Sequence, residues 1–119
     1  IADEVMTGFG KTGRNFASDF IDTKPDIICL SKALTAGLVP MAITSCTEKI
    51  YEAFLSNEMA KGFFHCHTYS ANPIACAAAN AAIALLQTDE IQDNIKNISA
   101  SHQEFQKRIS KHSKVFENF

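Results

Sequence analysis

The feature that most limits how this chain can fold is a short, uninterrupted apolar run at residues 26–31, DIICLS, directly after the Lys24-Pro25 turn. Continuous apolar side chains over this length are typical of a strand that is buried on both faces. A second run of the same kind, MAITSC at residues 41–46, follows Pro40. The sequence therefore predicts two short strands in the core of the protein.

Helical patterns alternate with these strands. Residues 72–87 begin with Asn72 at an N-cap position and Pro73 at the first helical position, which are both good start signals. Residues 88–110 place apolar residues at alternating steps of four and three, which predicts an amphipathic helix with one buried stripe. A shorter helix is predicted over residues 47–57. Strands that alternate with helices indicate an α/β fold of packed layers.

The stretch IADEVMTGFGKTG at residues 1–13 contains Gly8, Gly10 and Gly13 in a G-x-G-x-x-G pattern, which raises the question of a nucleotide site. A P-loop needs a glycine five positions before its Gly-Lys pair, and Val5 occupies that position. A dinucleotide fingerprint needs a helix directly after the glycines, but no long apolar-periodic helix follows before the next proline. The spacing therefore argues against both nucleotide patterns.

An acidic pair lies in the same stretch, inside an apolar run that resembles a strand. The period of two along a strand puts Ile1, Asp3 and Val5 on one face and Glu4 on the opposite face. A carboxylate that is buried on an apolar face needs a cationic partner. The alternative is a strand end at which Asp3 caps a turn, and these residues alone leave both interpretations open.

Lys32 is a candidate for the cationic partner or for a ligand-binding group. It follows the apolar run 26–31 in the segment SKALTAG, among apolar and small residues. A lysine at the carboxyl end of a strand in an α/β sheet projects into the crevice where ligands bind. The alternative is a lysine whose stem lies along the surface and whose amine reaches solvent.

Composition and charge argue against several classes of function. The 119-residue chain is 46% hydrophobic and begins at Ile1 within a strand-like run, so we expect it to be a globular internal piece of a longer chain. A net charge of −2 argues against a nucleic-acid-binding surface, and no run approaches the length of a membrane span. The four cysteines lack C-x-x-C spacing, which favours reduced thiols and a cytoplasmic location.

Three motifs together resemble a known family. IADEVMTGFGKTG, KPDIICLSKALTAG and HTYSANPIACAAA are similar to the class III aminotransferases, which use pyridoxal phosphate (PLP) and have fold type I. The resemblance implies that residues 1–87 are part of the PLP-binding large domain, a mostly parallel sheet with flanking helices. It implies that residues 88–119 are a helix leading towards the C-terminal small domain. Residues 8–13 would form a turn of tight backbone geometry rather than a phosphate site.

The same resemblance implies roles for five residues. Lys32 matches the lysine that holds PLP as a Schiff base and then moves a proton during transamination. Asp3 matches the aspartate that pairs with the protonated ring nitrogen, and Val5 would lie against the ring. Thr68 matches a threonine that reaches the phosphate of PLP in the partner subunit. His67, beside it, is also assigned to cofactor binding.

The implied activity is transfer of an amino group from a small-molecule donor to a keto acceptor, by a homodimer with active sites at the subunit interface. Met6 favours the branch of the family that serves biotin biosynthesis. The alternatives are an ω-amino acid transaminase, an aminomutase, or a non-catalytic domain of the same fold. By the same resemblance, the phosphate cup, the ring-stacking aromatic residue and the substrate-carboxylate arginine lie outside these 119 residues.

Two other kinds of site have weaker support. His65 and His67 form an H-x-H pair on a segment without helical period, but no third ligand with suitable spacing follows, so no metal site is expected. Asp3 and Glu4 do not suit an acid and base of a hydrolase, because adjacent strand residues face opposite ways and cannot flank one bond.

Overall fold

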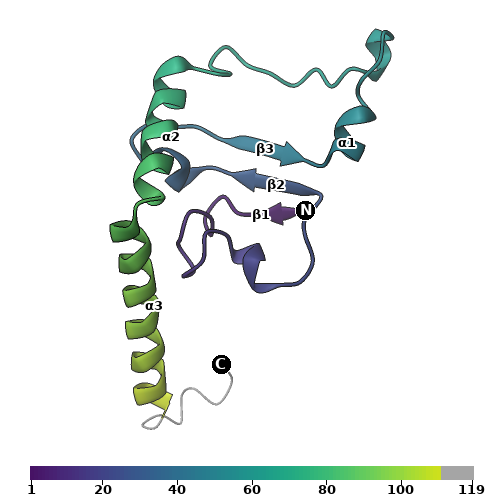
Figure 1. The fold of residues 1–119 in the computed structure, drawn as a ribbon. Helices are drawn as coiled ribbons and strands as arrows, with labels where there is room; N and C mark the ends of the chain where they lie inside the picture. The colour runs from purple at the N-terminus through teal and green to yellow at the C-terminus, as the bar shows by residue number, and fades with distance from the viewer. Residues whose placement is uncertain (111–119) are drawn as a thin grey trace.

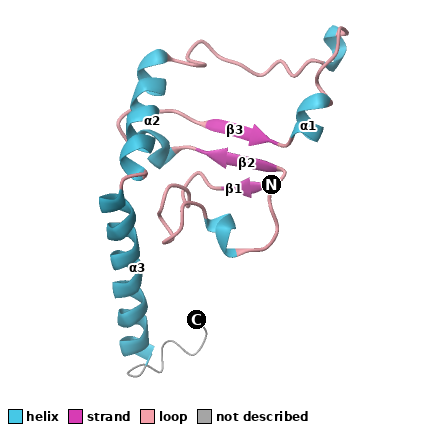
Figure 2. Cartoon of the chain, viewed as in Figure 1, coloured by secondary structure: helices cyan, strands magenta, loops and turns pink. Residues whose placement is uncertain are grey.

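The computed structural model describes residues 1–110, which form a three-stranded sheet flanked by helices (Figures 1 and 2). The strands lie in the order β1 (Ala2–Asp3), β2 (Ile27–Leu30) and β3 (Ile43–Cys46). β1 is parallel to β2, with Asp3 opposite Cys29, whereas β3 is antiparallel to β2. Both predicted strands are present, and each is shorter than its run. The predicted burial on both faces is wrong for the described residues, because β3 is exposed along its whole length and only Leu30 of β2 is fully buried.

The antiparallel pair departs from the mostly parallel sheet that the sequence predicts. Parallel strands need a long crossover that returns the chain to its starting edge, and an α-helix usually supplies it. The connection at residues 31–42 contains only the 3-10 helix η2 (Lys32–Thr35) and a turn. The chain therefore reverses, and β3 runs against β2. Alternation of strands and helices confirms the α/β class.

The connection from β1 to β2, residues 4–26, joins two parallel strands. It returns the chain to the starting edge, as a parallel pair requires, without any α-helix. Its only regular element is the 3-10 helix η1 (Ala17–Phe20). The conformation of this segment therefore depends on side-chain hydrogen bonds and on glycines in its turns.

Helix α2 (Pro73–Leu86) packs against η2 and with it forms the core of the described residues. Asn72 caps the helix as predicted, because its Oδ1 accepts hydrogen bonds from the N–H groups of Ile74 at 3.0 Å and Ala75 at 3.2 Å. The buried apolar side chains are Leu30, Leu34, Ala75 and Ala79. Alanines on the buried face allow α2 to approach η2 closely.

Helix α3 (Asp89–Ser110) follows a short break after α2 and extends away from the sheet (Figure 1). Ile91 and Ile95 in its first half are half-buried, but Ile98 is 57% and Phe105 51% exposed. The predicted single buried stripe is therefore wrong beyond Ile95, where only Ile109 of the stripe is half-buried, because described segments cover little of this part of the helix. The last part of the predicted 88–119 segment, residues 111–119, lies outside the described residues.

Helix α1 (Glu48–Glu52) is shorter than the predicted helix at residues 47–57. Phe54 and Leu55 are 45% and 58% exposed, and the contact of the Phe54 ring with Phe63 leaves too little packed surface to stabilise further turns. The chain continues through the 3-10 helix η3 (Met59–Lys61) and returns to α2 along an extended path (Figure 1). The lack of a helical period around His65 and His67 agrees with this path.

Candidate active site

The carboxyl ends of β1 and β2 lie at the same edge of the sheet, because the two strands are parallel (Figures 1 and 2). Asp3 is the last residue of β1, and Lys32 is the second residue after β2. Both side chains are exposed. The fold thus brings a carboxylate and an amine, which the sequence separates by a long connection, to one edge where a ligand can reach both.

The surroundings of Asp3 differ from the apolar face expected for it. Ile1 is 87% exposed, and Val5 is half-buried in the turn after β1. Among the described residues, Asp3 accepts one hydrogen bond, from the Val5 N–H to its Oδ1 at 3.1 Å. This bond is a turn cap, which was the alternative interpretation. Of the two interpretations that the sequence leaves open, the described residues show the turn cap, because no described segment covers this face.

The buried carboxylate of this strand end is Glu4, which is only 2% exposed. It accepts hydrogen bonds from the Thr7 hydroxyl and from the N–H groups of Ala17 at 3.0 Å and Ser18 at 2.6 Å. Its side chain therefore closes the following loop against the end of β1. The strand period placed Glu4 opposite Asp3, but it gave no sign that Glu4 is buried, since two of its donors are backbone groups.

Hydrogen bonding decides the charge of Glu4. Burial on its own raises the pKa of the Glu4 carboxyl, but hydrogen bonds from Thr7, Ser18 and Ala17 to the charged form outweigh it. The pKa is therefore held below its ordinary value of 4.5. Glu4 is an anion at neutral pH and stabilises the loop in that form.

Glu4→Gln in the full-length protein is expected to lower the free energy of unfolding by about 1–3 kcal/mol at pH 7, because the amide cannot accept from all three donors. The folded pKa lies below the unfolded one, so the stability from Glu4 is present above pH 4.5 and is lost as the pH falls through the folded pKa. Urea unfolding should thus show the largest deficit at neutral pH and a smaller one in acid.

Asp19→Asn is a matched control for this experiment. The Asp19 side chain is an exposed carboxylate in the same connection and accepts a hydrogen bond from the Phe16 N–H at 2.9 Å. Its replacement should cost about 1 kcal/mol or less. Equal losses in the two variants, or a Glu4→Gln deficit that is independent of pH, would contradict the assigned role of Glu4.

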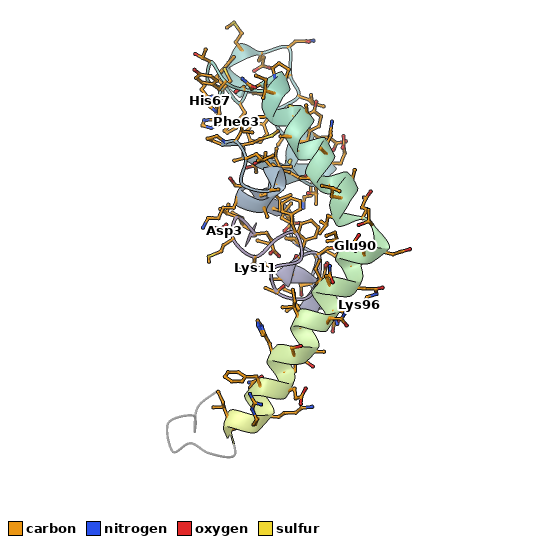
Figure 3. The ribbon with its side chains drawn as sticks, turned by 90° about the vertical axis from the view of Figure 1, so that its left-hand side faces the viewer. Asp3, Lys11, Phe63, His67, Glu90 and Lys96 are labelled. Carbon is orange, nitrogen blue, oxygen red and sulfur yellow. The ribbon has the colours of Figure 1, made fainter. Side chains whose placement is uncertain are left out.

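The glycines after β1 allow close packing against α3. Gly10 and Gly13 have φ angles of +90° and +95°, which side chains with a Cβ rarely adopt. A Cβ at Gly10 would lie 2.5 Å from Ile95 Cδ1, and one at Gly13 would lie 2.7 Å from Ser99 Oγ. In Figure 3, Lys11 of this loop lies near α3. The expectation of a turn with tight backbone geometry is confirmed.

His67 and Thr68 lie on the exposed path between η3 and α2. The His67 N–H donates to Ser70 Oγ at 3.1 Å, and the Tyr69 N–H donates to His67 Nδ1 at 3.2 Å, so the residues form a turn. Figure 3 shows His67 apart from Asp3. The structure therefore does not bring His67 to the strand edge that holds Asp3.

An open pocket of about 880 Å³ lies between this turn and the η2–β3 connection. Its lining includes Ser31, Met41 and His67, but not Thr68. Ser31 immediately precedes Lys32, so the pocket reaches the backbone that carries the candidate amine. Sequence reasoning missed the 39–42 wall of this pocket, because its residues are apolar and carry no chemical signal.

Two further findings concern residues 1–110. No helix in this part of the chain is both long and apolar enough to cross a membrane. Nor do three or more histidine, cysteine, aspartate or glutamate side chains in it come together as a metal ion would require.

A lysine and a carboxylate at neighbouring parallel strand ends are the groups that the resemblance to class III aminotransferases implies. The family model described as aminotransferase class-III matches residues 1–119, the whole chain. The chain therefore belongs to the class III aminotransferases.

Among curated relatives, the chain is 45% identical over 115 residues to the adenosylmethionine-8-amino-7-oxononanoate aminotransferase of Synechococcus elongatus, covering 97% of this chain and 27% of that protein. It is 39% identical over 102 residues to the omega-amino acid–pyruvate aminotransferase of Pseudomonas putida, covering 83% of this chain and 23% of that one. The chain thus spans about a quarter of the length of these relatives.

Solved structures share the fold. The ornithine aminotransferase of Toxoplasma gondii, described with PLP at partial occupancy in its active site, superposes with a TM-score of 0.73 at 30% identity. The match covers 89% of this chain and 24% of that one. This likeness confirms that the described elements form part of an aminotransferase fold.

Proposed function

We propose that the full-length protein is a PLP-dependent transaminase that converts 8-amino-7-oxononanoate to 7,8-diaminononanoate in biotin biosynthesis. The observation that carries the reaction type is the placement of Asp3 and Lys32 at one edge of the sheet. The choice of keto acceptor rests on the similarity to the Synechococcus elongatus enzyme and on Met6, which favours the same branch.

The chemistry of the two residues fits PLP. Lys32 offers an amine for the aldehyde carbon, and Asp3 offers a carboxylate for the ring nitrogen. Bound PLP would supply an electron sink for the carbon that loses its proton. Lys32 would bind it covalently and, when the substrate amine displaces it, would carry the proton between the two reacting carbon atoms. Asp3 would keep the ring nitrogen protonated, because an adjacent anion favours a cation.

Three further residues complete the proposed cofactor site. Val5 lies in the turn directly after β1 and would lie against the ring. Thr68 would donate its hydroxyl and backbone N–H to the phosphate of PLP held in the partner subunit of a homodimer, with His67 beside it. Both residues are exposed on the path before α2, where a partner subunit could reach them.

A second candidate is an ω-amino acid transaminase, which the similarity to the Pseudomonas putida enzyme favours. The two candidates differ in their substrates rather than in the roles of Asp3 and Lys32. A screen of the purified full-length protein separates them. Amino transfer from adenosylmethionine to 8-amino-7-oxononanoate supports the first, and transfer from ω-amino acids to pyruvate without the former reaction supports the second.

Borohydride reduction tests the reaction type. The full-length protein incubated with PLP is expected to be yellow, and reduction should fix a pyridoxyl group on Lys32, as located by peptide mass mapping. The other lysines of the first half of the chain, Lys11, Lys24 and Lys49, are internal controls and should stay unmodified. Labelling at one of these in place of Lys32 would overturn the assignment.

A further inference from the structure

Lys32 has an unusual backbone for a residue with a side chain. Its φ is +36°, in the left-handed region where a Cβ is crowded by the following carbonyl group. Ala36, at the other end of η2, has a φ of +53°. Residues in this region cost conformational free energy and persist only where the surroundings hold them. The neighbours of η2 must therefore hold Lys32 in place.

Two hydroxyl groups tie the ends of η2 to the same short segment. Ser31 Oγ donates a hydrogen bond to the Met41 carbonyl oxygen at 2.6 Å. Thr35 Oγ1 donates to the Val39 carbonyl oxygen at 2.7 Å. One bond lies directly before Lys32 and the other lies three residues after it. The turn that carries Lys32 is thus attached at both ends to residues 39–41.

The hydrogen bond of Thr35 is better shielded from solvent than that of Ser31, because Thr35 is buried in the core. Leu34 is 2% and Thr35 1% exposed, whereas Lys32 and Ala33 are exposed. Ala75 and Ala79 of α2 are buried as well, and α2 packs on η2. One side of η2 is therefore fixed in the core, and the opposite side presents Lys32.

We propose that Ser31 and Thr35 are positioning residues, which hold the Lys32 backbone in its left-handed conformation and so set the direction of its amine. The pocket wall at residues 39–42 then moves with the Lys32 turn as one unit, because both hydroxyls bond to it. The relevance of this direction to catalysis rests on the proposed function. The coupling of the turn to the wall does not.

The test uses the full-length protein with Thr35→Val, which keeps the shape of the side chain and removes the donor, and Thr35→Ser, which keeps the hydroxyl. In the cofactor-free protein, amide hydrogen exchange of residues 31–38 should be about tenfold faster in Thr35→Val than in the wild type. Attachment of PLP to Lys32, trapped by borohydride over a time course, should be about tenfold slower. Thr35→Ser should restore both rates.

Thr44→Val is the matched control, since Thr44 is an exposed residue of β3 and the change is chemically the same. It should leave both rates at the wild-type value. If Thr35→Val does not fold, Ser31→Ala at the half-buried end of the turn replaces it with the same expectations. Wild-type exchange over residues 31–38 in the variant used, or no rescue by Thr35→Ser, would overturn the proposal.

The two readouts separate this proposal from the proposed function. Borohydride trapping at another lysine in the wild type would refute the function assigned to Lys32. Faster exchange over residues 31–38 in Thr35→Val would still support the coupling of the turn to the wall. Unchanged exchange together with normal trapping on Lys32 would refute the positioning role and leave the proposed function intact.

Discussion

Full-length subunits carrying Lys32→Ala are expected to lose at least about 10³-fold of transaminase activity, because the variant loses both covalent attachment of PLP and the proton-transfer group. The steady-state rate with a saturating amino donor measures this loss. Lys49→Ala, which removes an exposed lysine on α1, is the control and should keep the wild-type rate. Near-normal turnover of Lys32→Ala would refute the proposed role.

The same variant tests whether Thr68 serves the partner subunit. Thr68→Glu should also be inactive, since a carboxylate at this position repels phosphate. Dimers that contain one subunit of each kind have one site in which both residues are intact. An equal mixture of the two inactive proteins should therefore recover about one quarter of wild-type activity after random exchange of subunits. Mixed dimers that are detected by mass and remain inactive would contradict a role for Thr68 across the interface.

Asp3→Asn is expected to retain the fold and to bind PLP, but to lose about 10²–10³-fold in turnover, the range typical of removing one preorganised electrostatic contact. The neutral amide cannot stabilise a proton on the ring nitrogen, whereas the single turn cap to Val5 can be kept by the amide oxygen. Stopped-flow absorbance should show a slowed proton-transfer step with little change in donor binding.

Asp22→Asn provides the control for charge alone, because Asp22 is an exposed carboxylate in the connection between β1 and β2. Its rate should equal that of the wild type. If Asp3→Asn also turns over at the wild-type rate, Asp3 is only the turn cap seen in the structure, and the ring nitrogen has another partner.

Sequence patterns predicted correctly those elements that are stabilised by interactions between residues close together in the chain. The Asn72-Pro73 pair gave the start of α2, and the cap bonds of Asn72 confirm the reason. The pattern at residues 47–57 failed, because continuing that helix depends on tertiary burial, and Phe54 and Leu55 stay exposed despite the contact of the Phe54 ring with Phe63. The direction of β3 also depends on how η2 turns the chain, which the apolar run at residues 41–46 cannot encode.

In the candidate site, too, features set by the local sequence were predicted and features set by tertiary structure were not. Lys32 was predicted at a strand end, and a strand end was one of two interpretations of Asp3. The parallel pairing of β1 and β2 brings both residues to one edge. Their chemical roles remain proposals. Glu4 escaped prediction because its partners are N–H groups 13 and 14 positions away, which any residue other than proline supplies. The left-handed backbone of Lys32 was equally invisible, since nothing in SKALTAG distinguishes it from an ordinary turn.

The connection between β1 and β2 has a consequence for how the molecule loses order on heating. Fixing a residue costs about 1–2 kcal/mol of conformational entropy, and an α-helical crossover would offset this with a regular ladder of internal bonds. Residues 4–26 instead have a four-residue 3-10 helix, scattered turn bonds and the Glu4 carboxylate. The entropy gained by releasing this segment grows with temperature, while few bonds oppose it. Thermal inactivation should therefore begin at the strand end that presents Asp3, while α2 and the β2–β3 pair are still folded.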